Sequence, residues 1–327
     1  MRNTRALRTY GLFVALTLVV VSSPPAARTS AGTAEPAAPL AVLISCDGEV
    51  TVLRKGGVVK GAFGLPLEAG DEIRTGAQAQ AEILFDNGNY VSLGAGSAMQ
   101  VKGSKHEATS STKPMGDNGF EVAQNFLKLK SPEGTSSIAA LRSGRKEAEL
   151  HALSPQRTRV LSTRPTFVWE FGSPEEELQI TIYGENGILW RHTLVGVSQL
   201  TYPDAAPPLT PGATYSWTVE TTDPLRVPPL RSNAAFFEVI TVEEQSKLGV
   251  ALEKIGDGAA SAQSQHVMRA SVFFAYNLLD DAVKETEQAL ALAPENTTLQ
   301  SILARLYAES GRTDRAAETY GRILDKQ

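Results

Sequence analysis

The sequence predicts a multidomain chain of the β-plus-α class: a small all-β domain, then a β-sandwich, then C-terminal helical repeats. Three observations lead to this prediction. Apolar residues alternate with period two from residue 81 onward, which is typical of a strand. Short apolar runs separated by prolines and turn residues follow between residues 154 and 240. Beyond residue 241 the apolar period becomes helical and repeats every 34 residues.

The first residues carry the pattern of an export signal. Three arginines precede an apolar run from Gly11 to Val21, and small residues follow. This run is shorter than the roughly 20 residues that a membrane span needs. We expect residues 1–27 to be a signal peptide, cleaved after Ala27 or Ala31, and residues 28–39 to be a flexible tether. The mature protein would then be periplasmic or secreted, with no stable membrane span.

A hairpin is the clearest element of residues 40–103. Ala81, Ile83 and Phe85 fall on one side of a strand and Glu82 on the other, so we predict a half-buried strand. Asp86-Asn87-Gly88-Asn89 then forms a tight turn, because Asn and Gly tolerate positive φ. The predicted return strand runs from Tyr90 to Leu93, with Val91 and Leu93 facing the core.

An ordered series of turn glycines and apolar positions extends around this hairpin. The series consists of Gly48-Glu49-Val50-Thr51-Val52, Gly64, Leu67, Gly70-Asp71, Ile73, Arg74-Thr75-Gly76, Ile83, Phe85, Gly88, Val91, Leu93, Met99 and Val101. It resembles the FecR-type periplasmic domain, a small all-β module of bacterial cell envelopes. The resemblance covers about a fifth of the chain and implies a fold; it carries over no catalytic residue.

Cys46 is the one cysteine of the chain, so an internal disulfide is excluded. Leu43-Ile44-Ser45-Cys46 resembles a lipobox, which would make Cys46 a lipid anchor. The alternative is that Cys46 is a small apolar residue in a first strand from Leu40 to Val52. We favour the strand because the apolar run of the signal ends about 25 residues earlier.

Residues 104–153 are predicted to be a loop or linker with additional strands. Ser104 to Gly119 is polar and dotted with glycine, which indicates an exposed loop. Phe126, Leu127 and Leu129 suggest a strand, as do Leu150 and Ala152. Two alternatives stay open: residues 120–153 add strands to the FecR-like domain, or they bridge to the next domain.

Residues 154–240 contain short strands spaced about 8–12 residues apart, which favours a β-sandwich. Leu209-Thr210-Pro211-Gly212-Ala213-Thr214-Tyr215 resembles the tyrosine corner of fibronectin type III and immunoglobulin-like domains. That resemblance implies that the Tyr215 hydroxyl bonds to nearby backbone. Tyr215, Trp217 and Val219 would share one face.

The three tryptophans offer an alternative to this packing role, namely a platform on which a sugar stacks. Aromatic residues at strand spacing more often lie in a core, so we assign Trp169 and Trp217 to the core. Trp190 is followed by Arg191 and His192, and we expect it to be partly exposed.

Residues 241–327 are predicted to be helical repeats. Thr241-Val242-Glu243-Glu244 forms a capping box, and Leu248, Ala251, Leu252 and Ile255 form an apolar stripe behind it. The repeat itself places Ala270, Phe273, Asn277, Ala282 and Leu290 34 residues before Ala304, Tyr307, Gly311, Ala316 and Leu324. This pattern resembles tetratricopeptide repeats, in which small residues let two helices approach closely.

Only two such repeats are visible, whereas about three are usually needed to bury their apolar faces. We therefore expect the repeats to complete their core against the sandwich, a second copy or a partner. Asn296-Thr297-Thr298 matches a glycosylation acceptor, but we expect Asn296 to cap a helix.

Residues with catalytic spacing are not evident. His106, His151, His192 and His266 lie far apart in sequence and lack metal-ligand spacing, with His266 expected to be solvated or a helix cap. We predict no catalytic, cofactor-binding or metal site and no enzyme activity; the binding residues are unknown from the sequence. A net charge of −5 argues against nucleic acid as a partner.

Two functions remain. The first is an exported, non-enzymatic scaffold of the cell envelope, whose repeats bind envelope proteins and whose β domains contact proteins or cell-wall glycan. The second is a FecR-like regulator that senses an envelope signal. Few residues precede the apolar run, so we expect no cytoplasmic sigma-factor-binding domain, and we favour the scaffold.

Overall fold

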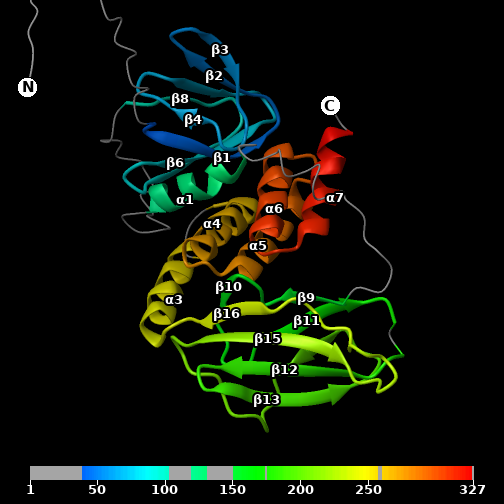
Figure 1. Cartoon of the computed structure of the whole chain (residues 1–327). Helices are drawn as coiled ribbons and strands as arrows, with labels where there is room; N and C mark the ends of the chain where they lie inside the picture. Colours follow the sequence, from blue (N-terminus) through cyan, green and yellow to red (C-terminus); the bar gives the residue numbers. More distant parts are fainter. Residues whose placement is uncertain (1–38, 103–118, 131–149, 174, 257–259, 326–327) are drawn as a thin grey trace, which may run out of the picture. The chain divides into compact units, whose positions relative to one another are not determined.

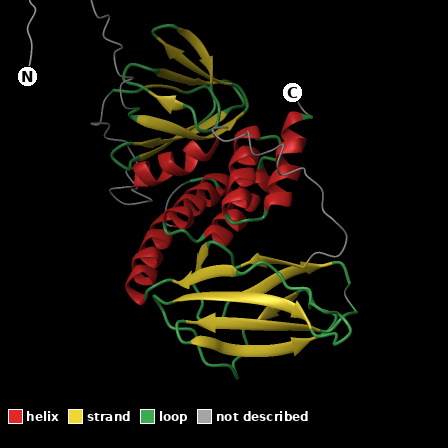
Figure 2. Ribbon diagram, viewed as in Figure 1, coloured by secondary structure: helices red, strands yellow, loops and turns green. Residues whose placement is uncertain are grey.

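The computed structural model describes residues 39–102, 119–130, 150–173, 175–256 and 260–325 (Figure 1). Strands occupy roughly the first two thirds of the described chain and helices the last third, and one further helix lies between the two groups of strands (Figure 2). The predicted fold class, β domains followed by helical repeats, is therefore confirmed.

The first β region, residues 39–102, holds two four-stranded antiparallel sheets among the described residues. Their strand orders are β4-β1-β6-β7 and β3-β2-β5-β8. The strands are β1 (Ala41–Asp47), β2 (Val50–Arg54), β3 (Gly57–Lys60), β4 (Pro66–Leu67), β5 (Glu72–Thr75), β6 (Gln80–Phe85), β7 (Tyr90–Leu93) and β8 (Ala98–Gln100). The predicted hairpin is confirmed, because β6 pairs with β7 and Gly88 in the turn has a φ of 79°.

The prediction that β6 is half-buried is wrong, because both of its faces are covered. Ala81, Ile83 and Phe85 are inaccessible and lie in the core between the two sheets. On the opposite face Leu84 is equally buried, and Glu82 is only 6% exposed. Helices pack on that face as well, so the strand is buried on both sides and does not need a polar residue at every second position.

The predicted single strand from Leu40 to Val52 is also wrong. β1 and β2 belong to different sheets, and the chain turns between them at Gly48, where φ is 73°. A Cβ at this position would lie 2.8 Å from the carbonyl oxygen of Gln78, so the turn depends on glycine. Cys46 lies in β1, and burial raises the pKa of its thiol to about 12.

Residues 119–130 form a helix where a strand was predicted. They comprise α1 (Gly119–Leu127) and a 3₁₀ turn, η2 (Lys128–Lys130). The buried residues Phe120, Ala123, Phe126 and Leu127 recur at helical spacing, a stripe that the strand prediction overlooked. The loop predicted for residues 104–119 lies outside the described residues except for Gly119, the first residue of α1.

The second β region, residues 150–240, contains one five-stranded and one three-stranded sheet within its described part. Their orders are β10-β16-β15-β12-β13 and β14-β11-β9, and β10 runs parallel to β16. The strands are β9 (Leu150–Ser154), β10 (Thr158–Val160), β11 (Thr166–Phe171), β12 (Leu178–Gly184), β13 (Gly187–Leu194), β14 (Gln199–Thr201), β15 (Thr214–Thr221) and β16 (Ala235–Val239). Leu150 and Ala152 lie in a strand as predicted, and this strand joins the second β region, not the first.

Aromatic residues hold the second β region together as expected. The backbone N–H of Thr210 donates a 2.8 Å hydrogen bond to the Tyr215 hydroxyl. Trp169 and Trp217 are at most 1% exposed, and Trp217 packs edge-to-face on Phe167 with ring centroids 5.1 Å apart. Trp190 is partly exposed and stacks on His192.

The helical region consists of α3 (Val242–Gly256), α4 (Ala262–Ala275), α5 (Leu279–Leu292), α6 (Thr297–Glu309) and α7 (Thr313–Leu324). The capping box that begins α3 is confirmed: Glu244 N–H donates to Thr241 Oγ1, and Thr241 N–H donates to the Glu244 carboxylate, both at 3.2 Å. Asn296 caps α6 by accepting from the N–H of Leu299.

Candidate functional site

The helices α4 to α7 cross at the small residues that the 34-residue period predicts. Ala270, Ala282, Ala304 and Ala316 are inaccessible to solvent, so no larger side chain fits between the helices. The turn residues at the equivalent positions 277 and 311 both have positive φ, 57° for Asn277 and 78° for Gly311. The 34-residue repeat is therefore seen both at the helix crossings and in the turns between the helices.

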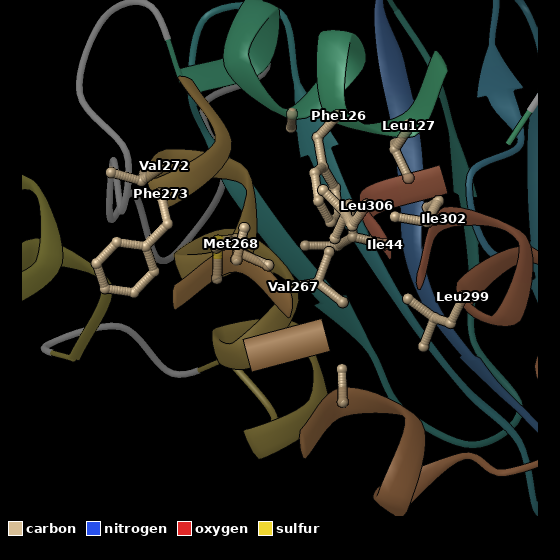
Figure 3. Close-up of a cluster of buried hydrophobic side chains, with 14 of the residues drawn as sticks. Ile44, Phe126, Leu127, Val267, Met268, Val272, Phe273, Leu299, Ile302 and Leu306 are labelled. Carbon is tan, nitrogen blue, oxygen red and sulfur yellow. The ribbon is translucent and has the colours of Figure 1, made fainter. Parts of the chain in front are cut away.

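The apolar face of α4 and α6 is covered by the protein's own chain. Figure 3 shows Phe126 and Leu127 of α1 and Ile44 of β1 directed toward Val267 of α4 and Leu306 of α6. Val42, Ile44, Leu84 and Tyr90 contribute the other face of the β1–β6–β7 sheet to this cluster. The two repeats thus complete their core largely against the first β region and α1, an arrangement that differs from the three predicted possibilities.

Phe126 is the central side chain of this contact. It is inaccessible to solvent, and its ring meets that of Phe274 edge-to-face at a centroid distance of 6.0 Å. Beside it, Lys130 Nζ donates a 2.8 Å hydrogen bond to the carbonyl oxygen of Gly64. Burial lowers the pKa of Lys130. One apolar and one polar contact therefore hold α1 and η2 in place.

A buried carboxylate joins the first β region to the start of α4. Glu82 accepts hydrogen bonds from the backbone N–H of Ser261 at 2.7 Å, from Ser261 Oγ at 2.6 Å and from Ser264 Oγ. Ser261 is itself the N-cap of α4. A negative charge at a helix N-terminus is stabilised by the unpaired N–H groups and the helix dipole. Burial, followed by the nearby Glu82, raises the pKa of Tyr90.

The second β region contacts the helical region through a polar joint. Thr158 Oγ1 accepts from the N–H of Leu279 at 2.8 Å, and Arg159 binds the Glu244 carboxylate through two nitrogens at 3.0 and 2.6 Å. The hydrogen bonds from Arg159, and next those from Thr241, lower the pKa of Glu244 to about 2. Glu244 of the α3 capping box therefore also attaches the helical region to the second β region.

A cavity of about 1050 Å³ lies next to this joint, and we call it the repeat cavity. Strands β9 and β11 supply one wall, and α5, α6 and the start of α7 supply the other. Thr313, Asp314, Arg315 and Glu318 line it and are exposed, so the cavity opens to solvent. Its principal charged and polar lining residues are His151, Ser154, Glu170, Asn233, Glu287, Tyr307, Arg312, Asp314, Arg315 and Glu318.

Hydrogen bonds fix several of these side chains. Asp280 accepts from Ser154 Oγ at 2.6 Å and from the Arg312 guanidinium. Burial, and next the charge of Arg315, lowers the pKa of Arg312 to about 10, so Arg312 is still cationic at neutral pH. Tyr307 donates to Glu287 at 2.5 Å, and burial raises its pKa, with Glu287 as the next cause.

The histidines are not brought together. His151 lines the repeat cavity, His192 stacks on Trp190 at a centroid distance of 5.3 Å, and His106 lies outside the described residues. His266 Nδ1 lies 2.6 Å from Glu285 and so links α4 to α5, which corrects the predicted solvated or capping role. Within the described ranges, no group of three or more His, Cys, Asp or Glu side chains could hold a metal ion.

Sequence reasoning missed Glu82 and the repeat cavity. Glu82 sits in a strand where an acidic residue at a solvent position is unremarkable, and its partners lie 179 or more residues away. The cavity likewise needs strands of the second β region and helices more than 100 residues further along the chain. None of the helices in the described part of the chain is long and apolar enough for a transmembrane segment.

Comparison with known proteins gives one family match. Residues 273–327 match the model of the tetratricopeptide repeat. None of the curated proteins compared with the chain matches it.

Two solved structures are weakly similar. CopC from Methylosinus trichosporium OB3b is 17% identical over 29% of this chain and 96% of its own, with a TM-score of 0.23. Dimeric latent PorU from Porphyromonas gingivalis is 11% identical over 59% of this chain and 16% of its own, also with a TM-score of 0.23. The match of residues 273–327 to the tetratricopeptide repeat indicates interaction with other proteins.

Proposed function

We propose that the protein is an exported, non-catalytic scaffold of the cell envelope that binds a segment of a partner protein in the repeat cavity. One observation carries this proposal. The apolar face of α4 and α6 is already covered by α1 and the first β region, whereas the repeat cavity is open and is lined by exposed residues of α7. The cavity is therefore a surface of the repeats that a partner can reach.

The chemistry of the cavity suits a polar peptide segment. Arg312 and Arg315 offer cationic groups, and Glu287 and Glu318 offer carboxylates, so side chains of either charge find a partner. The volume of about 1050 Å³ is slightly above the range of roughly 300–1,000 Å³ that small-ligand pockets enclose. Arg312 is held by Asp280 before any partner binds, which reduces the conformational entropy that binding costs.

We propose a structural role for the first β region. Its resemblance to FecR-type domains rests on turn glycines and apolar core positions. Asp71, which belongs to the same series, is 2% exposed and binds Arg54 Nε and Nη2 at 2.7–3.2 Å. One sheet face of this region packs against α1 and α4. We therefore propose that it serves as an envelope module that supports the repeats, and not as an iron-transport sensor.

Export follows from the proposed signal peptide of residues 1–27. Cleavage immediately before Cys46, as for a lipoprotein, would remove Ala41 to Ser45, which are buried residues of β1. The proposal is therefore that cleavage occurs upstream of β1 and that Cys46 carries no lipid. Mass spectrometry of the mature N-terminus tests this, and a diacylated Cys46 would contradict it.

The binding proposal is tested by charge reversal in the cavity. The mature chain, its Arg315→Glu variant and its Lys247→Glu variant are used to capture proteins from envelope extract. Lys247 lies on α3, is not among the residues that line the cavity and is 64% exposed, so it is the matched control. We expect a partner that wild type and Lys247→Glu retain and Arg315→Glu loses. Retention of every captured protein by Arg315→Glu would refute the cavity as the site.

A further inference from the structure

Helix α1 is distant in sequence from the helices against which it packs. It is joined to β8 by residues 103–118 and to β9 by residues 131–149, and both of these connections lie outside the described residues. An extended chain spans about 3.3–3.6 Å per residue, so each connection is long enough to bridge roughly 50 Å. Chain length therefore allows α1 and η2 to leave their place without any change in β8 or β9.

The helix α1 is amphipathic and contributes a single apolar stripe to the core. Its buried side chains recur at helical spacing on one side, at Phe120, Ala123, Phe126 and Leu127. Its exposed residues lie on the other side, at Glu121, Asn125 and Lys128. The stripe is directed toward the apolar face of α4 and α6 (Figure 3). An amphipathic helix laid on an apolar face is one of the recurrent modes by which a protein binds a helical segment of a partner.

The first β region is attached to the helices independently of α1. Glu82 accepts three hydrogen bonds from Ser261 and Ser264 at the start of α4, and the β1–β6–β7 sheet packs in the same apolar cluster. By contrast, α1 and η2 are held by the apolar stripe and by the 2.8 Å hydrogen bond from Lys130 to the Gly64 carbonyl oxygen. If α1 left, the sheet and α4 would stay joined, and the apolar face beneath α1 would open.

We propose that α1 is an internal pseudo-ligand, and that the face of α4 and α6 beneath it binds an amphipathic helix of a partner protein. The contacts of α1 define that partner helix. It carries an aromatic residue that packs on Phe274, as Phe126 does at a ring-centroid distance of 6.0 Å, and an apolar residue directly after it. A lysine four positions after the aromatic residue donates to the Gly64 carbonyl oxygen, as Lys130 does. This surface is separate from the repeat cavity, whose lining includes no residue of α1.

A labelled peptide of residues 119–130 is the probe, and fluorescence anisotropy measures its binding to three forms of the mature chain. Phe126→Ala weakens the attached α1 and leaves α4 and α6 unchanged, whereas Glu121→Gln, on the exposed side of α1, is the matched control. The attached α1 competes with the peptide at an effective concentration that is roughly millimolar. We therefore expect Phe126→Ala to bind the peptide at least about tenfold more tightly than wild type or Glu121→Gln does. A peptide that itself carries Phe126→Ala should bind the same chain at least about tenfold more weakly.

Two further measurements keep the test decisive if Phe126→Ala fails to fold. Lys130→Ala removes only the hydrogen bond to Gly64, and its affinity for the peptide should exceed that of wild type about threefold. Hydrogen exchange on the wild-type chain should be at least about tenfold faster in α1 than in α4 and α6, because α1 opens without them. The proposal is overturned if the peptide binds every chain alike or none, if both peptides bind equally, or if α1 exchanges only together with α4 and α6.

Discussion

Glu82 gives the sharpest prediction for how the β and helical regions are joined. Glu82→Gln keeps the size of the side chain but removes its charge and turns one acceptor oxygen into a donor. Three donors from Ser261 and Ser264 converge on the two carboxylate oxygens. Hydrogen bonds to a charged group contribute about 1.5–3 kcal/mol, and a charge at a helix N-terminus a further ~0.3–1 kcal/mol. Because the serine hydroxyls can rotate to accept from the new amide, we expect a net loss of about 2–3 kcal/mol.

Urea unfolding at neutral pH measures this loss for the mature chain. The midpoint should fall while the dependence on urea concentration is unchanged, since the exposed surface is the same. Glu253→Gln, which makes the same chemical change at an exposed position of α3, is the control, and its effect should stay within ~0.5 kcal/mol. A Glu82→Gln variant as stable as this control would refute the role of Glu82 as a buried helix cap.

Three further substitutions test other parts of the fold. Phe126→Ala should cost about 3–5 kcal/mol in denaturant unfolding, because it empties an inaccessible site against Phe274; a loss below about 1 kcal/mol would show that α1 is dispensable. Asp71→Asn should cost about 3 kcal/mol at pH 7. Burial alone would raise the pKa of Asp71, but the hydrogen bonds from Arg54 and Glu68 N–H outweigh it and lower the pKa. The advantage of wild type should therefore be complete above the ordinary aspartate pKa and disappear as pH falls through the lowered value; a pH-independent difference would contradict this. Tyr215→Phe removes the acceptor of the Thr210 N–H and should lower stability by about 1 kcal/mol in thermal unfolding, whereas an unchanged Tm would argue against the tyrosine corner as a stabilising contact.

Local patterns predicted the elements whose geometry depends on neighbouring residues. The hairpin of β6 and β7, the hydrogen bond to Tyr215 and the capping box of α3 are each formed by residues that are close to one another in the sequence. The repeat period also predicted which alanines are inaccessible, because helix crossings recur at fixed spacing. These features follow from period and turn chemistry alone.

Features that depend on distant contacts were not predictable in the same way. The segment containing Phe126 and Leu127 was assigned to a strand because its last apolar residues are adjacent or alternate, whereas the helical stripe begins earlier, at Phe120. Glu82 was placed on the solvent side because its partners in α4 are 179 or more residues away. The repeat cavity is built by strands and helices more than 100 residues apart, so no window of sequence could indicate it.

The structure shows how two repeats bury their apolar face without a third repeat. Two repeats expose an apolar face on α4 and α6 that a third repeat would otherwise cover. Here Ile44 and Leu84 of the first β region, with Phe126 of α1, cover that face. These strand and helix segments therefore take the place of a third repeat.

The most direct measurement is the unfolding of residues 241–327 expressed alone, followed by circular dichroism in denaturant and by sedimentation. Because the first β region and α1 complete the core of the repeats, the isolated segment should lack a cooperative transition or should self-associate through its uncovered face. A monomer that unfolds cooperatively, with a stability close to that of the same helices in the full chain, would contradict the account.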